Sequence, residues 1–210
     1  MLGEVQRWLE AVYRVGAPDV EDFVVDDAQL DAVRPAAAAR PADEWVLVRE
    51  GPDGVDLAVW VDARHRAALA AAGSLPAAVE ACFPAVCAAV EGVSHFLLLV
   101  ERARRAEPVS LLELEAQAEV DKFICARLHH PDRGREWHAR LFRDARLHDG
   151  LSEDEAWRYR EAGRLAAGLC ARLDRHRHAA AILDEVRAFW RSSGGARLDR
   201  MRRLAAGRAA

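Results

Sequence analysis

The chain has 210 residues, of which 51% are hydrophobic and 30% are charged. These fractions exclude disorder over the whole chain, because enough apolar surface is present to form a core. The counts of 13 Gly, 8 Pro and 4 Cys exclude collagen-like and disulfide-dense secreted proteins. Alanine accounts for 43 residues, and every basic residue except Lys122 is an arginine. Since Ala, Arg and Glu favour helices, the composition indicates a mostly helical protein.

The net charge of −4 is unevenly distributed along the chain. Residues 1–62 hold 14 acidic and 5 basic residues, residues 63–174 hold 17 and 16, and residues 175–210 hold 3 and 9. An acidic head and a basic tail are typical of surfaces that steer or dock a partner. The chain as a whole is not basic enough to indicate a dedicated nucleic-acid binder.

The first third of the chain predicts one helix and a small sheet. Residues 2–14 place apolar side chains at helical spacing, and the segment at 21–25 reads as a short strand. Residues 44–50 and 54–62 alternate between apolar and polar side chains, and Pro-Asp-Gly at 52–54 joins them as a hairpin. A short helix at 28–33 and a loop at 35–41 lie between the first and second strands.

After Asp62 the pattern predicts only helices. Pro84 predicts a kink in the second of them, and Ser152 with Glu155 forms a capping box that opens a later one. The predicted helices cover residues 63–72, 76–105, 109–128, 137–147, 153–174, 178–192 and 196–206. We therefore expect an α+β fold, mostly α, in which a small N-terminal antiparallel sheet of about three strands packs with a C-terminal helical bundle.

We expect a single domain over residues 1–210 with two lobes. The lobes are residues 1–62, a helix plus the small sheet, and residues 63–195, the helical bundle; a basic tail at 196–210 follows. The N-terminus carries acidic residues and no long apolar run, which is not the pattern of a signal peptide. The apolar stretch at 81–100 is interrupted by Glu91 and His95, which favours a buried helix over a membrane span. We expect a cytoplasmic protein of bacterial type with reduced cysteines.

A polar cluster between two helices is the sharpest site prediction. Glu91 and His95 are four residues apart on one helical face, with Arg102 further along it. Glu113 and Gln117 interrupt the apolar face of the next helix, which the short connection predicts to be antiparallel. Such a cluster either fixes helix register by hydrogen bonds or forms a small pocket. In the pocket, Glu91, His95 and Glu113 are the catalytic candidates for acid–base chemistry, and Arg102 and Gln117 are the ligand-binding candidates.

Metal and cofactor signals are weak. Cys125 and His129 are four residues apart and His138 follows, but their spacing matches no closed zinc pattern. No phosphate-binding loop or nucleophile elbow occurs, so we expect no cofactor. Lys122 lies with Glu115 and Glu119 on the face opposite the apolar one, which predicts a solvated ion pair.

The basic tail gives the nucleic-acid candidates. These are Arg197, Arg200, Arg202 and Arg203, which could contact phosphates. No recognition helix or set of stacking aromatic residues accompanies them, so a solvated tail or a tail docked on acidic groups is favoured.

Three functions follow from these observations. The favoured one is a non-enzymatic interaction or regulatory protein that uses its helical surface to bind a protein partner or a second copy of itself, with no membrane partner. The first alternative is a small-molecule-binding protein or enzyme that uses the interhelical pocket. The second is a nucleic-acid accessory protein that uses the basic tail.

Overall fold

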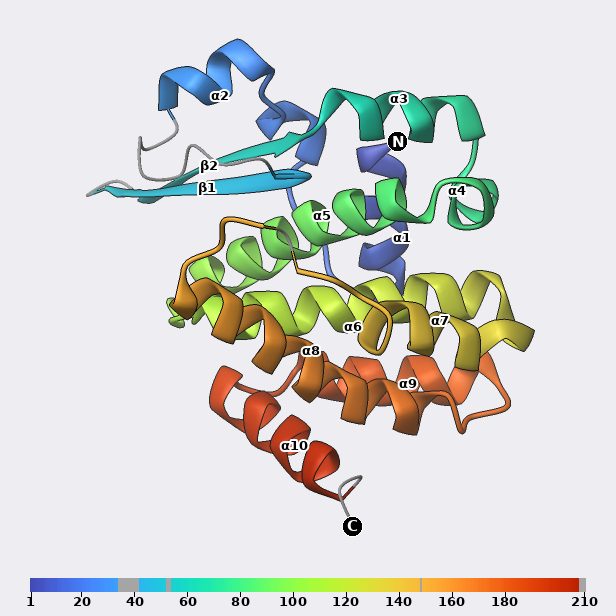
Figure 1. Ribbon diagram of the computed structural model, residues 1–210. Helices are drawn as coiled ribbons and strands as arrows, with labels where there is room; N and C mark the ends of the chain where they lie inside the picture. The colour runs from blue at the N-terminus through green and yellow to red at the C-terminus, as the bar shows by residue number, and fades with distance from the viewer. Residues whose placement is uncertain (34–41, 52–53, 148, 208–210) are drawn as a thin grey trace. The chain divides into compact units, whose positions relative to one another are not determined.

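Figure 1 shows the computed structural model, which describes residues 1–33, 42–51, 54–147 and 149–207. Contacts between Cα atoms divide the chain into two compact units. Unit 1 consists of Met1–Trp8 and Gly16–Glu107, and unit 2 consists of Leu9–Val15 and Pro108–Ala210. The single domain with two lobes and a tail stays a prediction.

The described residues are mostly helical with one antiparallel pair of strands, so the α+β, mostly α class is confirmed. Helix α1 (Leu2–Tyr13) begins in unit 1 and ends in unit 2. The other elements of unit 1 are η1 (Val20–Phe23), α2 (Asp27–Val33), β1 (Glu44–Gly51), β2 (Gly54–Val61), α3 (Ala63–Ala72), α4 (Leu75–Ala81) and α5 (Phe83–Arg104). The other elements of unit 2 are α6 (Leu111–His129), η3 (Pro131–Arg133), α7 (Gly134–Phe142), α8 (Glu153–Leu173), α9 (Ala179–Trp190) and α10 (Gly194–Ala206).

The predicted hairpin is present in unit 1. Strands β1 and β2 pair antiparallel over their full length, from Glu44 opposite Val61 to Gly51 opposite Gly54. Gly54 has a φ of 138°, a backbone angle that L side chains rarely adopt, so glycine suits the end of the turn. Residues 52 and 53 of the predicted turn, and the predicted loop at 35–41, lie outside the described residues.

The third predicted strand, at residues 21–25, is wrong. Its first three residues form the 3-10 turn η1 together with Val20, because the Asp19 side chain accepts a hydrogen bond from the backbone of Glu21 and caps the turn. Only a single parallel bridge, between Val24 and Val59, follows it. The described part of the sheet therefore has two strands.

Helix α5 packs on the hairpin inside unit 1. A Cβ added at Gly92 would lie 3.5 Å from the side chain of Val59 on β2, which is an ordinary contact distance between packed elements. The predicted helix at 76–105 is divided at Cys82 into α4 and α5, which is a break rather than the expected kink. Pro84 then lies in the first turn of α5, where its missing N–H costs no hydrogen bond.

Among the described helices, α5 is the one whose length and composition would let it cross a membrane. Of its most apolar 18-residue window, 72% is buried inside the protein. A core helix that other elements cover passes the same test, so this feature by itself gives only weak support for a membrane span.

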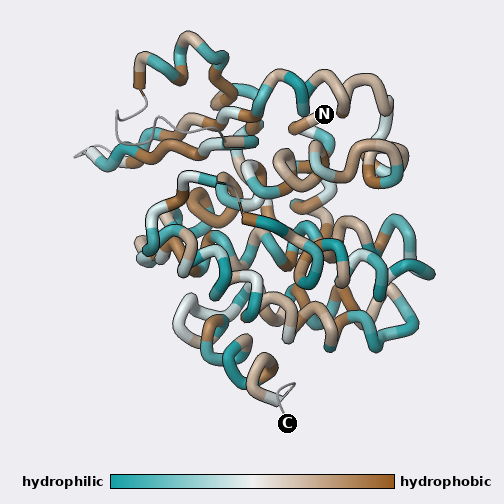
Figure 2. The backbone as a smooth tube through the Cα atoms, viewed as in Figure 1, coloured by the Kyte–Doolittle hydropathy of each residue, from teal (hydrophilic) through white to brown (hydrophobic). Residues whose placement is uncertain are grey.

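Unit 2 is a bundle in which α6 and α8 run in the same direction. Glu115 and Arg158 face each other near the start of both helices, at 3.5 Å, and Arg127 bonds Asp174 at 2.8 Å near their ends. Figure 1 shows the long connection after α7 that returns the chain to the start of α8. Along α8 and α10, Figure 2 shows hydrophilic and hydrophobic residues in alternation, as expected for helices with one buried face.

Helices α8 and α10 approach closely at Gly168. A Cβ added there would lie 2.7 Å from the backbone nitrogen of Ala205, so the contact requires glycine. Gly163 lies earlier on the same helix, and a Cβ added there would meet nothing within 4 Å. The close contact between these helices is therefore confined to the later glycine.

The predicted solvated face of α6 is wrong. Glu115 and Lys122 are both buried, because α7 and α8 pack on α6. The predicted ion pair is present, since Lys122 bonds Glu119 at 2.7 Å. Helix α6 is thus a central helix whose charged side chains meet partners at its flanks.

Candidate functional site

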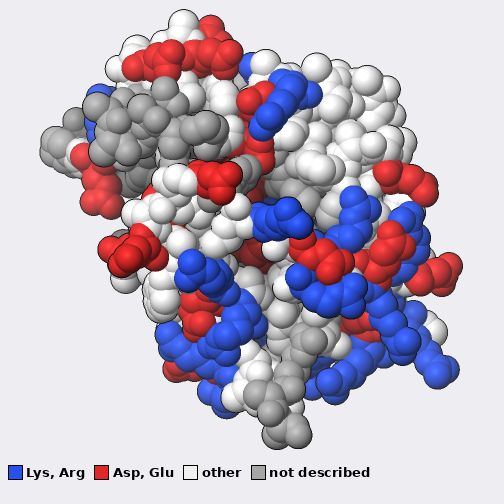
Figure 3. All heavy atoms as spheres, in the orientation of Figure 1, with Lys and Arg blue, Asp and Glu red and all other residues white. Residues whose placement is uncertain are grey.

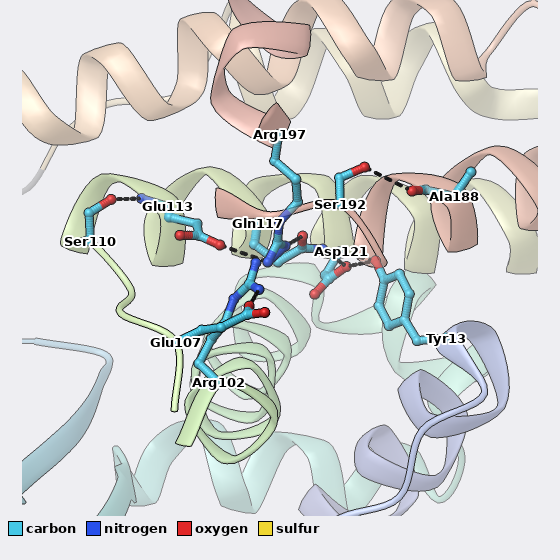
Figure 4. A network of polar contacts seen from close by, with 10 residues as sticks. All are labelled: Tyr13, Arg102, Glu107, Ser110, Glu113, Gln117, Asp121, Ala188, Ser192 and Arg197. Atoms are coloured by element: carbon cyan, nitrogen blue, oxygen red, sulfur yellow. Dashed lines mark hydrogen bonds and ion pairs between the residues drawn. The ribbon is translucent and has the colours of Figure 1, made fainter. Parts of the chain in front are cut away.

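A buried network of polar side chains joins α1, α6 and α10 inside unit 2 (Figure 4). Arg197 of α10 donates to Glu113 Oε1 at 2.7 Å and to Gln117 Oε1 at 2.6 Å. Both acceptors lie on α6, one turn apart, and all three side chains are buried. A guanidinium can bond two acceptors at once because its donors form a planar fork.

The network continues from Gln117 to the C-terminal end of α1. The Gln117 amide nitrogen donates to Tyr13 Oη and to Asp121 Oδ1, each at 2.9 Å, and the Tyr13 hydroxyl donates to Asp121. The ring of Tyr13 stacks on Trp190 of α9, with centroids 4.2 Å apart. Arg187, also on α9, donates to the carbonyl oxygen of Val12 at 2.7 Å, so it caps the last turn of α1.

The hydroxyl of Tyr13 is held in its protonated form. Burial raises the pKa of the phenol well above its ordinary value of 10.0, and the charge and hydrogen bond of Asp121 raise it further. Arg197 and Gln117 act in the opposite direction with smaller effect. Tyr13 therefore acts as a hydrogen-bond donor to Asp121 at neutral pH.

Local sequence around Arg197 explains why this charged side chain enters the core. Gly194, at the start of α10, lies against Glu113: a Cβ added there would be 2.2 Å from Glu113 Oε2. The Arg197 guanidinium lies near the rings of Phe189 and Trp190, at 5.6 and 5.5 Å from their centroids. Glycine gives room for the carboxylate, and the aromatic faces favour the cation.

Arg197 was predicted to belong to a basic tail that is either solvated or docked on acidic groups, and the structure places it in the core against Glu113. The reason is the tertiary contact with Glu113 and Gln117, which were themselves predicted as polar interruptions of an apolar face. Sequence reasoning missed Tyr13 and Asp121. The only local signal was the spacing of four between Gln117 and Asp121, which places both on one face of α6.

The other members of the predicted interhelical cluster lie on α5 in unit 1. His95 and Arg102 are buried there, and Glu91 is half-buried. The chain turns back after α5 through Ala106, with a φ of 51°, and Arg102 forms an ion pair with Glu107. That these residues join Glu113 and Gln117 in one catalytic or ligand-binding cluster stays a prediction.

The zinc candidates do not form one group in the described part of unit 2. Cys125 is fully buried and His129 is half-buried at the end of α6. His138 Nε2 lies 3.0 Å from the carbonyl oxygen of Ala167, and its ring packs at 6.1 Å from that of Phe123. These contacts describe side chains that hold α7 against its neighbours.

A second cluster lies at the surface of unit 2 and surrounds Glu185 of α9. Oε1 of Glu185 accepts from Arg172 Nε and from Arg200 Nη2, each at 2.6 Å, and Oε2 lies 2.7 Å from His176 Nε2. Burial raises the pKa of Glu185, but the hydrogen bonds from His176 and Arg172 and the charges of Arg172 and Arg200 outweigh it, so the pKa is lowered overall. Glu185 therefore remains ionised among three basic groups.

The four arginines predicted as nucleic-acid contacts thus have different environments. Arg197 is buried, Arg200 bonds Glu185, Arg202 bonds Asp199 at 2.8 Å, and Arg203 is exposed. Within the described part of α10 they do not form one continuous basic stripe. Of the surface cluster, sequence reasoning found only Arg200, because Arg172, His176 and Glu185 come from other segments.

No protein-family model, curated protein or solved structure matches this chain.

Proposed function

We propose that this chain is a non-enzymatic interaction protein that binds an acidic partner through the helical surface of unit 2. The observation that carries the proposal is a surplus of exposed arginines. Between Ala156 and Gly207, two acidic residues are exposed, Asp184 and Asp199. Over the same range the exposed basic residues are Arg160, Arg164, Arg172, Arg175, Arg177, Arg191, Arg202 and Arg203.

Several of these arginines have donors to offer to a partner. Five of them, Arg160, Arg175, Arg177, Arg191 and Arg203, bond no other side chain in the described part of the chain. A guanidinium carries five N–H donors arranged for carboxylate or phosphate oxygens. Figure 3 shows many blue side chains, with red ones among them, over the helices of unit 2.

The net charges of the two units support an acidic rather than a basic partner for unit 2. Unit 2 contains 21 basic and 17 acidic residues, a net charge of +4. Unit 1 contains 9 basic and 17 acidic residues, a net charge of −8. A positive surface attracts an acidic partner over a range set by ionic strength, and it speeds their encounter.

The buried network of unit 2 supports a binding function over an enzymatic one. Glu113, Gln117, Asp121, Tyr13 and Arg197 bond one another, so the groups that could serve acid–base chemistry there already hold helices together. Interhelical networks of this kind fix the register of packed helices.

The proposal is tested with a poly-glutamate peptide, titrated by fluorescence anisotropy at low and at physiological ionic strength. We expect salt-dependent binding that the triple variant R175E/R177E/R203E weakens by about threefold to a hundredfold, since each surface pair contributes roughly 0.2–1 kcal/mol. The control R7E/R49E/R64E makes the same change of net charge in unit 1 and should retain binding.

Two results would overturn the proposal. One is no binding of poly-glutamate at low salt, and the other is equal weakening by both triple variants. A DNA duplex of equal charge serves as the competing probe, and preference for DNA would favour the nucleic-acid alternative. A mass that rises with concentration in light scattering, and falls in R175E/R177E/R203E, would identify a second copy as the acidic partner.

A further inference from the structure

Arg172 of α8 and Arg200 of α10 meet at one carboxylate oxygen. Because both bond Oε1 of Glu185, their guanidinium groups lie next to each other, and His176 bonds the other oxygen. The Glu185 side chain is 8% exposed, whereas those of Arg172, His176 and Arg200 are 49%, 31% and 29% exposed. The carboxylate is covered, and the three basic groups reach the solvent.

Most donors of the two guanidinium groups are left over after Glu185 is bonded. Arg172 uses Nε and Arg200 uses Nη2, and neither side chain has another polar partner in the described part of the chain. Both terminal amino groups of Arg172, and Nε and Nη1 of Arg200, therefore remain for a ligand. The Nδ1 atom of His176 is a further donor only when the imidazole is protonated, because the hydrogen of the neutral ring is used by Nε2 in the bond to Glu185.

The cluster has a positive net charge that the covered carboxylate does not cancel. Two arginines and one ionised glutamate give +1, and protonation of His176 gives +2. The carboxylate also restrains both guanidinium groups, so less side-chain entropy is lost when a ligand binds. The tight contact at Gly168, one turn before Arg172, fixes α8 against α10.

We infer that Arg172, His176 and Arg200 form a binding site for a phosphate monoester, carried as a phosphorylated side chain by the acidic partner. This inference rests on the proposed function, because the phosphate belongs to that partner. A phosphate group has a charge close to −2 and three terminal oxygens, which match the charge and the paired guanidinium forks of the cluster. A carboxylate ligand has only one negative charge and two oxygens. It would match the cluster less well than a phosphate group, because Glu185 already supplies one carboxylate to the same basic groups.

The test compares two short, otherwise identical peptides, one with phosphoserine and one with glutamate at the same position. Fluorescence anisotropy with the full chain should show at least tenfold tighter binding of the phosphopeptide. R172A and R200A should reduce that preference to less than threefold. The matched controls R175A and R203A remove an exposed arginine from the same region and should keep the preference.

Glu185 is tested as a positioning residue. E185Q makes the cluster more positive, so a purely electrostatic effect would tighten phosphopeptide binding. If the carboxylate orients the guanidinium groups, binding should instead weaken by severalfold. Tighter binding by E185Q would overturn this role.

Titration with inorganic phosphate, followed by NMR of the arginine Nε–H signals, locates the site. The signals of Arg172 and Arg200 should shift, and those of Arg175 and Arg203 should not. Equal shifts of all four signals would overturn the site. If poly-glutamate binds but phosphoserine gives no preference over glutamate, the phosphate site is wrong and the proposed function stands; if neither peptide nor poly-glutamate binds, the proposed function is wrong.

Discussion

Arg197 and Arg200 lie three residues apart on α10, and each bonds a glutamate of unit 2. Arg197 is 1% exposed, and its partners on α6 are part of a network that continues to α1. In the pair of Arg200 and Glu185 the carboxylate is also covered, but the arginine side chain is 29% exposed and keeps donors for the solvent or a ligand. The burial of the arginine therefore decides what each pair does, since a covered guanidinium specifies packing and a partly exposed one remains available for binding.

The largest effect is expected from breaking the buried pair. R197M keeps the side-chain volume but removes the guanidinium that bonds the buried Glu113, which should lower the free energy of unfolding by about 3–5 kcal/mol. Urea denaturation measures the change. R203M, on the exposed face of the same helix, is the control and should change stability by less than about 0.5 kcal/mol.

A second variant sharpens this prediction. The double variant R197M/E113L removes both charges, and it should recover most of the stability lost in R197M, because no uncompensated charge stays buried. A loss below about 1 kcal/mol in R197M, or no recovery in the double variant, would contradict a buried pair of this kind.

The next largest loss of stability is expected at the contact between α8 and α10, the helix that carries both arginines. In G168A the added methyl group would meet the backbone of Ala205 at 2.7 Å, and backbone cannot move aside as a side chain can. We expect a loss of about 2–4 kcal/mol in urea denaturation, together with weaker phosphopeptide binding. G163A on the same helix meets no atom within 4 Å and should gain up to about 1 kcal/mol, since alanine favours helices. Similar effects in the two variants would refute close packing at Gly168.

Tyr13 tests the far end of the buried network. Y13F removes the donor to Asp121, and we expect a loss of about 1–3 kcal/mol because the buried carboxylate loses a hydrogen bond. The pKa of the Tyr13 hydroxyl is raised in the folded protein, so its contribution is present below about pH 10 and is lost as pH rises through the folded pKa. Stability measured against pH should therefore fall more steeply above about pH 10 in the wild type than in Y13F.

The smallest effect is expected at the surface pair. E185Q should change the free energy of unfolding at neutral pH by less than about 1 kcal/mol, because its arginine partners are solvated. The pKa of Glu185 is lowered in the folded protein, so the contribution is present above the ordinary glutamate pKa of about 4.3 and is lost as pH falls through the folded pKa. Acid denaturation should show a flatter pH dependence in E185Q. If E185Q lowered the free energy of unfolding by more than about 3 kcal/mol, the Arg200–Glu185 pair would not differ from the buried Arg197–Glu113 pair.

Local patterns predicted most helices because their causes lie within a few residues. The capping box of Ser152 and Glu155 opens α8 as expected, and Gly73, with a φ of 75°, ends α3. Pairing of β1 with β2 followed from alternation and a turn sequence. The prediction of a third strand was wrong because the Asp19 side chain caps a 3-10 turn in that segment, and only a single bridge to Val59 follows the turn.

Site residues were predicted less completely, because their partners are distant in sequence. Glu113 and Gln117 stood out as polar residues on an apolar face, but their partner Arg197 was assigned to the tail. Arg200 was picked out as a basic residue, while the Glu185 that holds it was not. In each case the sequence did not show which distant residue the side chain would bond.

The sequence by itself determined the mostly helical class, the positions of most helices, the hairpin and the charge difference along the chain. Composition, periodicity and capping act over a few residues, so they can be read directly from the chain. The tertiary structure alone decided that Tyr13 bonds Asp121 across 108 positions and that Arg197 bonds Glu113 across 84. Two arginines one helical turn apart differ in role because only the packing of α6, α8 and α9 around α10 determines which of them is covered.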